Sequence, residues 1–261
     1  MKIAVFSDVH SNSTALKKTI DMIERENVNE VVFLGDLLTY GCNVIETIDL
    51  LMKFSNERKV HFIKGNHDQI YFDMQDGKNF QYKPFPEFIL ESALYTGDKL
   101  ECKLHELFQW KQSITIGNVL FSHANALGDG NWSYLNNDQE IIDTASVILQ
   151  KGYLGGVFGH THRPKLSIYQ IGNDIQNLSV IGLKQLIIPY VDKCFVANSG
   201  SVGQPRGIES SILFIDINLN NSHVELEVKT ISYNKSEHCE NIKSSTLSQI
   251  TKDKLISYYK N

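Results

Sequence analysis

The sequence is poor in cysteine and has no long apolar run. Its four cysteines lie far apart, at positions 42, 102, 194 and 239, and none belongs to a C-x-x-C pair. This spacing argues against a zinc knuckle or a disulfide framework and is typical of reduced thiols. No segment reaches the roughly 18 consecutive apolar residues of a membrane-spanning helix, and the N-terminal apolar run is shorter than that of a signal peptide. We therefore expect a cytoplasmic protein without a membrane partner.

Positive charge is also scarce. The 261 residues include 25 Lys and Arg against 30 Asp and Glu, a formal net charge of −5, and only four residues are arginines. The basic field that attracts nucleic acid is therefore absent, and we expect no nucleic-acid partner. What is present, 42% hydrophobic and 21% charged residues, is ordinary for a globular domain. The length is sufficient for a single large domain over residues 1–261. Nothing in the sequence predicts an oligomeric state.

Short apolar runs alternate with helical patterns in the first part of the chain. The runs are typical of buried strands, and the segments between them carry apolar residues at helical spacing. The three runs are residues 3–6, 31–34 and 60–63, and the helical segments are 14–26 and 44–54. This alternation predicts parallel strands covered by helices.

The rest of the chain has a different pattern. Between residues 69 and about 112 the strand pattern stops, which predicts a mostly helical insertion. Strand-like runs return at 119–121 and 157–158 and become frequent from 179 to 232, which predicts an antiparallel meander facing the first sheet. A polar segment at about 244–259 predicts a C-terminal helix.

Potential metal ligands follow most of the predicted strands. In open α/β sheets, ligands bind beyond the carboxyl ends of the strands, so these loops are expected to converge on one crevice. Imidazole, carboxylate and amide donors without thiols suit divalent first-row metals and disfavour a structural zinc site. The residues are Asp8, His10, Asp36, Asn66, His67, His123, His160 and His162.

Structural roles are the alternative for these residues. Taken singly, Asp8 and Asp36 fit helix or turn caps equally well. However, five of the nine histidines occupy the positions just described, which surface scatter does not explain. Alternation also places His160 and His162 on one face of an extended segment. By contrast, Asn12 or Ser13 is expected only to cap the helix that starts near residue 14.

Five blocks of this sequence resemble those of the calcineurin-like metallophosphoesterases, in the family's order. They are Asp8-Val9-His10, Gly35-Asp36, Gly65-Asn66-His67-Asp68, Ser122-His123 and Gly159-His160-Thr161-His162. The similarity runs from residue 2 to about 216, and residues 200–206 resemble a block of the small prokaryotic phosphodiesterase branch. The resemblance implies an α/β (α+β) fold, a two-sheet β-sandwich flanked by helices in four αββα layers.

The resemblance also implies roles for the residues. By it, one metal ion is held by Asp8, His10 and His162 and a second by Asn66, His123 and His160, with Asp36 as the bridge. Manganese is the expected metal, with iron, zinc or nickel as alternatives. Two such ions about 3.5–4 Å apart activate a shared water. The resemblance also implies that His67 faces the substrate and not a metal ion. We expect this histidine to protonate the leaving oxygen. Asp68 is the candidate to orient His67 or His10.

The segment from Gly35 to Gly41 limits the classes of substrate that we expect. Phosphatases and symmetrical dinucleotide tetraphosphatases of this superfamily carry Asp-Arg-Gly there, and their arginine clamps phosphate, whereas this chain has Tyr40. We therefore expect a small phosphodiester or nucleotide-like substrate. Arg163 and Arg206 are candidates to reach its phosphate, against a surface or structural role. Two other functions are a nuclease, which the acidic charge disfavours, and a catalytically weak scaffold that binds a protein partner, which the retained ligands disfavour.

Overall fold

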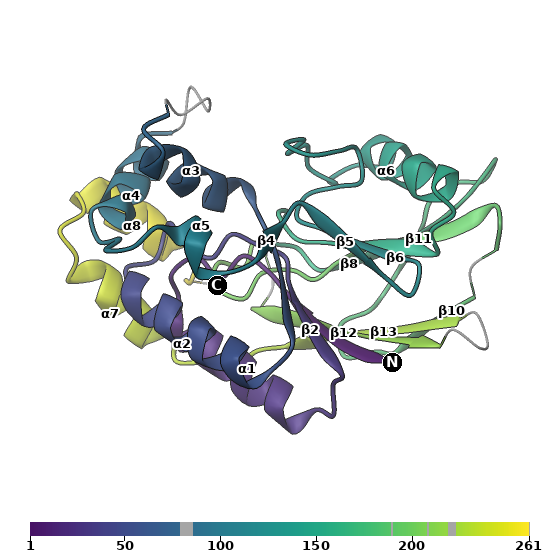
Figure 1. The fold of residues 1–261 in the computed structure, drawn as a ribbon, viewed down its shortest axis with the longest axis horizontal. Helices are drawn as coiled ribbons and strands as arrows, with labels where there is room; N and C mark the ends of the chain where they lie inside the picture. The colour runs from purple at the N-terminus through teal and green to yellow at the C-terminus, as the bar shows by residue number, and fades with distance from the viewer. Residues whose placement is uncertain (79–85, 189, 208, 219–222, 261) are drawn as a thin grey trace.

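The structure is a computed structural model that describes residues 1–78, 86–188, 190–207, 209–218 and 223–260. Within these ranges, the strands form one seven-stranded and one six-stranded sheet. The two sheets face each other, and helices cover their outer faces (Figure 1). The predicted two-sheet sandwich flanked by helices is thereby confirmed.

The first sheet has β1 near its centre. From β1 to β4 its strands run parallel, whereas β12 pairs antiparallel with β1, β13 with β12, and β10 with β13. In spatial order the strands are β10 (Gln185–Ile187), β13 (His223–Thr230), β12 (Ser211–Asn218), β1 (Lys2–Phe6), β2 (Glu30–Phe33), β3 (Val60–Ile63) and β4 (Trp110–Lys111).

The second sheet has a parallel core with antiparallel edges. Strand β7 lies between β6 and β11 and runs parallel to both. In spatial order the strands are β5 (Ser113–Ile116), β6 (Val119–Ser122), β7 (Gly155–Phe158), β11 (Lys193–Asn198), β8 (Lys165–Gln170) and β9 (Gln176–Leu178).

The antiparallel meander expected over 179–232 is wrong in its placement. Strands β10, β12 and β13 do run antiparallel, but they extend the first sheet, and β11 joins the second sheet parallel to β7. The reason is that β12 is buried on both faces over most of its length, so it needs a packed layer on each face. Its place beside β1, in the middle of the first sheet, provides both layers. Pairing of this kind brings together residues as distant in sequence as Lys2 and Asp216.

Strand alternation builds the layers. Ile3 and Val5 of β1 point into the core between the sheets, whereas Ala4 and Phe6 face the helices. Helices α1 (Ser13–Arg25) and α2 (Val44–Glu57) cover the first sheet, and α6 (Asp138–Gln150) covers the second. As predicted, Asn12 caps α1, because its side-chain oxygen accepts a hydrogen bond from the N–H of Ala15.

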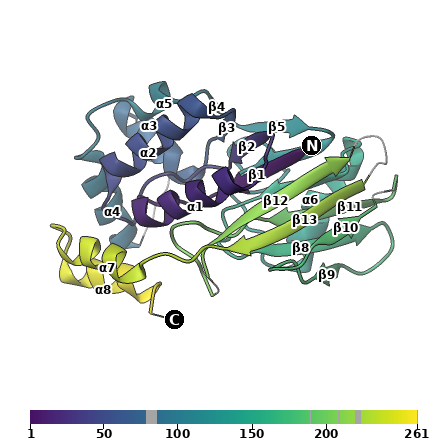
Figure 2. The same cartoon turned by 90° about the horizontal axis from the view of Figure 1, so that it is seen from below.

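Further helices lie at one end of the sandwich (Figure 2). Helices α3 (Asn66–Gln75), α4 (Glu87–Gly97) and α5 (Leu104–Leu107) occupy most of the expected insertion, of which residues 79–85 lie outside the described residues. The C-terminal helix expected at about 244–259 is α8 (Gln249–Ser257), and a further helix that was not expected, α7 (Lys235–Lys243), precedes it. The two helices are separate because Ser244 ends α7 and the Ser248 hydroxyl caps α8. Among the described helices, none is both long and apolar enough to cross a membrane.

Candidate metal centre

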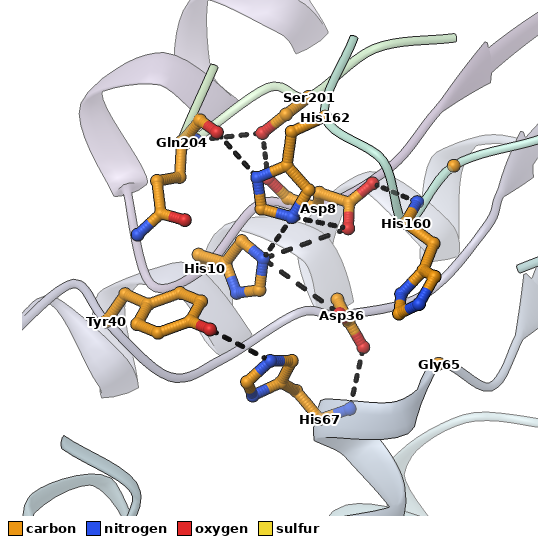
Figure 3. Close-up of polar contacts among 12 residues, drawn as sticks. Asp8, His10, Asp36, Tyr40, Gly65, His67, His160, His162, Ser201 and Gln204 are labelled. Carbon is orange, nitrogen blue, oxygen red and sulfur yellow. Dashed lines mark hydrogen bonds and ion pairs between the residues drawn. The ribbon is translucent and has the colours of Figure 1, made fainter. Parts of the chain in front are cut away.

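The expected metal ligands meet at one edge of the sandwich (Figure 3). Each lies just beyond the carboxyl end of a strand, where the backbone leaves the sheet. Asp8 and His10 follow β1, Asp36 follows β2, Asn66 follows β3, His123 follows β6, and His160 and His162 follow β7.

Asp8, His10 and His162 form the first group of ligands. The Nε2 atom of His162 lies 3.2 Å from Asp8 Oδ1 and 3.2 Å from the Nε2 atom of His10. His10 Nε2 lies 3.8 Å from the same Asp8 oxygen. All three side chains are buried, and their ligand atoms lie within 4.8 Å of one another. The spacing therefore suits a single metal ion.

Asp36, His123 and His160 form the second group, and their ligand atoms also lie within 4.8 Å of one another. The Nε2 atom of His123 lies 3.4 Å from Asp36 Oδ2 and 3.1 Å from the amide oxygen of Asn66. Asp36 Oδ2 is also 3.9 Å from the Nε2 atom of His10 in the first group. Asp36 is therefore positioned between the two groups, as a bridging carboxylate requires.

The hydrogen bonds of the imidazoles test whether these residues fit a metal ion. A backbone carbonyl only accepts hydrogen bonds, so the ring nitrogen that faces one carries the proton and leaves the other nitrogen with a free lone pair. The Nδ1 atoms of three histidines face carbonyls: His10 that of Leu38 at 2.9 Å, His123 that of Leu34 at 2.7 Å and His162 that of Gln204 at 2.6 Å. In the neutral imidazole, each of these Nε2 atoms therefore presents a lone pair to the centre.

His160 has the opposite orientation. Its Nε2 atom donates to the carbonyl of Trp132 at 2.9 Å, which leaves Nδ1 as the ligand. In the first group, the Nε2 atoms of His10 and His162 face each other at 3.2 Å, and Asp8 Oδ1 is buried without a hydrogen-bond donor among the described residues. A cation satisfies all of these lone pairs, so the side chains fit a divalent ion.

The pKa shifts of most ligand side chains favour the protonation state that binds a metal ion. Burial acts to raise the pKa of Asp8, but His162 beside it holds that pKa below its usual range. His123 likewise outweighs burial and holds the pKa of Asp36 well below its usual range. Burial, with His162, lowers the pKa of His10. By contrast, Asp36 raises the pKa of His123 to about 9 although burial acts to lower it, so a metal ion must displace this proton.

The backbone of the ligand loops is strained. Of nine described non-glycine residues with positive φ, eight lie in these loops. Such angles are uncommon outside glycine and persist only where the surroundings enforce them. The eight residues are Asp8, His10, Ser11, Asp36, Thr39, Tyr40, His160 and His162. Side chains are thus aimed at the centre by backbone conformations that the rest of the fold must maintain.

Glycines allow two of these loops to touch. A Cβ atom on Gly35 would collide with the backbone of Gly65, and one on Gly65 would collide with the Asp36 carboxylate. Asp68 then ties the same loops together, because its carboxylate accepts hydrogen bonds from the N–H groups of Asp36, Leu37 and Gly65 at 2.8–3.0 Å. Burial and the nearby charge of Asp36 raise the pKa of Asp68 to about 7.

The role expected for Asp68 is therefore wrong. Its carboxylate orients neither His67 nor His10, because it bonds three backbone N–H groups and neither imidazole, and His10 is oriented by the carbonyl of Leu38. The partners that do orient the ligands are backbone carbonyls, which have no signature in a sequence. One side-chain contact has a signature, because Ser201 lies in the glycine-rich block and donates to the carbonyl of Asp8 at 2.8 Å.

His67 lies next to the centre but belongs to neither ligand group. Its backbone N–H donates to Asp36 Oδ1 at 2.8 Å, and its ring lies with its centroid 5.1 Å from that of His10. The Nε2 atom is 3.2 Å from the hydroxyl of Tyr40. Burial lowers the pKa of His67 to about 4, so its imidazole is neutral near pH 7. This placement is consistent with a substrate-facing residue.

The two candidate arginines differ. Arg206 is partly buried and hydrogen-bonds to Tyr134, whose ring stacks on His160 with centroids 4.2 Å apart. No carboxylate pairs with Arg206 among the residues that the structure describes. Arg163 is exposed, and within the same part of the chain its side chain makes no hydrogen bond with the ligands. Only Arg206 is therefore brought to the rim of the centre.

Known proteins share this fold and sequence pattern. An uncharacterized protein of Methanocaldococcus jannaschii is 26% identical over 234 residues, which cover 87% of this chain and 88% of that protein. A metallophosphoesterase from Sphaerobacter thermophilus has a TM-score of 0.71 at 19% identity, with 99% of each chain covered. A hypothetical protein from Pyrococcus horikoshii has a TM-score of 0.72 at 15% identity, with 97% of each covered. The family model of the calcineurin-like phosphoesterase superfamily domain matches residues 1–220, and the chain belongs to that superfamily.

Proposed function

We propose that this protein is a metal-dependent phosphodiesterase that hydrolyses a small phosphodiester or nucleotide-like substrate with a water activated between two divalent ions. The observation that carries the proposal is the pair of adjacent ligand groups with Asp36 between them. A protein that binds one structural ion does not require a second group of metal ligands. An enzyme that uses two ions to activate water and to neutralise phosphoryl oxygens does require it.

The chain's own residues define the two metal positions. Asp8, His10 and His162 would hold one ion, and His123, His160 and Asn66 the other. Bound there, the two ions would lower the pKa of a shared water towards neutrality and neutralise charge on the phosphoryl oxygens. Nitrogen and oxygen donors without thiols suit divalent first-row metals, among which we propose manganese, with iron, zinc or nickel as alternatives.

His67 is the proposed proton donor. It lies beside the bridging Asp36, and its ring is free of both ligand groups. An alkoxide leaves slowly without a proton, and a positioned imidazole that supplies one accelerates such steps by about 10²–10⁴-fold. Burial disfavours the imidazolium in the free enzyme, whereas the negative charge of a bound phosphate favours it.

Arg206 is the proposed contact to a phosphate oxygen. A partly buried guanidinium without a carboxylate partner is suited to an anionic ligand, and Tyr134 anchors it beside His160. The arginine of the phosphatases is replaced by Tyr40, which is 3% exposed and carries no charge. With Tyr40 in place of the phosphatases' arginine, Arg206 suits a diester, which has one negative charge, better than a monoester dianion.

The test is a substrate screen of the manganese-reconstituted enzyme. We expect turnover of bis(p-nitrophenyl) phosphate to exceed that of p-nitrophenyl phosphate, with close to two equivalents of manganese bound. His123→Ala is the control, because it removes a ligand and should abolish the activity. A preference for monoesters or phosphoserine peptides would refute the diester assignment. Metal binding without turnover of any phosphoester would favour the scaffold instead.

A further inference from the structure

Tyr40 makes the hydrogen bond that holds the ring of His67. Its hydroxyl lies 3.2 Å from His67 Nε2, and the two ring centroids are 4.9 Å apart. The other ring nitrogen of His67, Nδ1, is buried and has no hydrogen-bond partner among the described residues. The imidazole is therefore held at Nε2, and Nδ1 is left without a protein partner among the described residues.

The backbone at Tyr40 is held in an unusual conformation. Thr39 has a φ of 77° and Tyr40 a φ of 66°, a region that residues with bulky side chains rarely adopt. Two neighbouring helices maintain it. The N–H of Tyr40 donates to Ser92 Oγ of α4 at 2.7 Å, and Thr39 Oγ1 lies 2.6 Å from the Tyr71 hydroxyl of α3. A strained turn stabilised by two separate helices indicates that the position of this side chain matters.

The ring of Tyr40 packs against apolar side chains of α4 and of the C-terminal segment. It stacks on Phe88 of α4 with centroids 6.3 Å apart, and it belongs to one apolar cluster with buried residues of the C-terminal segment. That segment lies beyond residue 220, outside the match to the family model. Its buried members are Ile242, Leu247, Leu255, Ile256 and Tyr259.

We propose that Tyr40 is the positioning residue of His67, and that α4, α7 and α8 hold it in place. A hydroxyl both donates and accepts, so it bonds Nε2 whether or not that nitrogen carries a proton. When the imidazolium gives its Nδ1 proton to the leaving oxygen, Nε2–H still donates to Tyr40, and the ring keeps its orientation. This inference rests on the proposed function, because it assigns His67 a leaving group to protonate.

The test compares Tyr40→Phe with Tyr95→Phe. Tyr95 belongs to the same apolar cluster, but its hydroxyl lies beside the thiol of Cys42. For Tyr40→Phe we expect kcat on an alkyl diester to fall by about tenfold, the effect of one lost hydrogen bond. The loss on a nitrophenyl diester should be smaller, and KM and metal content should not change. Tyr95→Phe should match the wild type. An equal loss on both substrates, or a loss of metal, would overturn the proposal.

A double-mutant cycle sharpens the test. If Tyr40 acts through His67, adding Tyr40→Phe to His67→Ala should cost no further activity. A full additional tenfold loss would show that Tyr40 acts independently of His67.

A spectroscopic measurement separates this inference from the proposed function. In the zinc-loaded protein, the ¹⁵N resonances of His67 can be identified by their disappearance in His67→Ala. We expect the Nε2 resonance to shift in Tyr40→Phe and to stay in place in Tyr95→Phe. If the wild type turns over no phosphoester, the proposed function fails and the shift still decides whether the hydrogen bond exists. An unchanged resonance would overturn the inference whatever the activity.

Discussion

The metal-site loops and the C-terminal helices are built on opposite principles. The loops after β1, β2 and β7 bury carboxylates and imidazoles on strained backbone. Helices α7 and α8 bury apolar side chains on ordinary helical backbone, and Leu255 is 1% exposed. The strained loops are costly in free energy, and the favourable packing of other regions must compensate for that cost. Substitutions in the two regions should therefore separate activity from stability.

The largest effect is expected at the bridging carboxylate. Asp36→Asn removes the anionic link between the two groups and should lower kcat by at least about 10³-fold, because metal ions supply several kcal/mol of charge stabilisation. His10→Gln, which affects one group, should cost less. Thermal unfolding of the metal-free proteins should show little loss of stability for either variant. A large fall in Tm for Asp36→Asn would contradict the separation.

Leu255→Ala should show the opposite behaviour. Removing a buried leucine side chain from α8 creates a cavity, and we expect the free energy of unfolding to fall by about 2–5 kcal/mol. Metal stoichiometry should stay at the wild-type value, since no ligand comes from α8. Urea unfolding and elemental analysis measure the two quantities. Ile250→Ala, at an 80% exposed position of the same helix, is the matched control and should be nearly neutral.

His67→Ala distinguishes chemistry from metal binding within the loops. Metal content should remain intact, and kcat on a substrate with an alkyl leaving group should fall by about 10²-fold or more, with little change in KM. The loss on a nitrophenyl leaving group should be much smaller, because that anion departs without a proton. His123→Ala should instead deplete metal and reduce both activities alike. Metal loss from the His67 variant would show that His67 is a ligand.

The smallest effect concerns His238, the buried histidine of α7. Burial lowers its pKa from 6.5 to about 3, so below pH 6.5 the unfolded chain takes up a proton that the folded protein excludes. Stability is therefore greatest above pH 6.5 and is lost as the pH falls. Between pH 6.5 and 5.5 this single group should cost about 1 kcal/mol. His238→Gln should flatten the pH dependence of urea unfolding by that amount, and an unchanged dependence would contradict it.

The metal ligands could be predicted from the sequence because their side chains have a distinctive chemistry. Metal-binding side chains recur directly after strand patterns, and the sheet then brings them to one edge. The elements that orient them could not be found, because the carbonyls of Leu34 and Leu38 belong to the backbone that every residue has. Buried and less buried side chains alternate along β13, but such alternation does not specify the neighbouring strand. The placement of β12 and β13 in the first sheet therefore could not be predicted.

The pairing of β1 with β12 has a kinetic consequence. It joins residues as distant as Lys2 and Asp216, and the hydrogen bond from Ser201 to Asp8 spans 193 residues. Contacts of such separation form late, because closing the intervening loop costs entropy before the contact repays it. A nascent chain on the ribosome carries Asp8 and His10 long before the segment that orients His162 has been made. We therefore expect the first metal position to be loaded after the sandwich closes, so that an ion stabilises a finished fold and does not nucleate it.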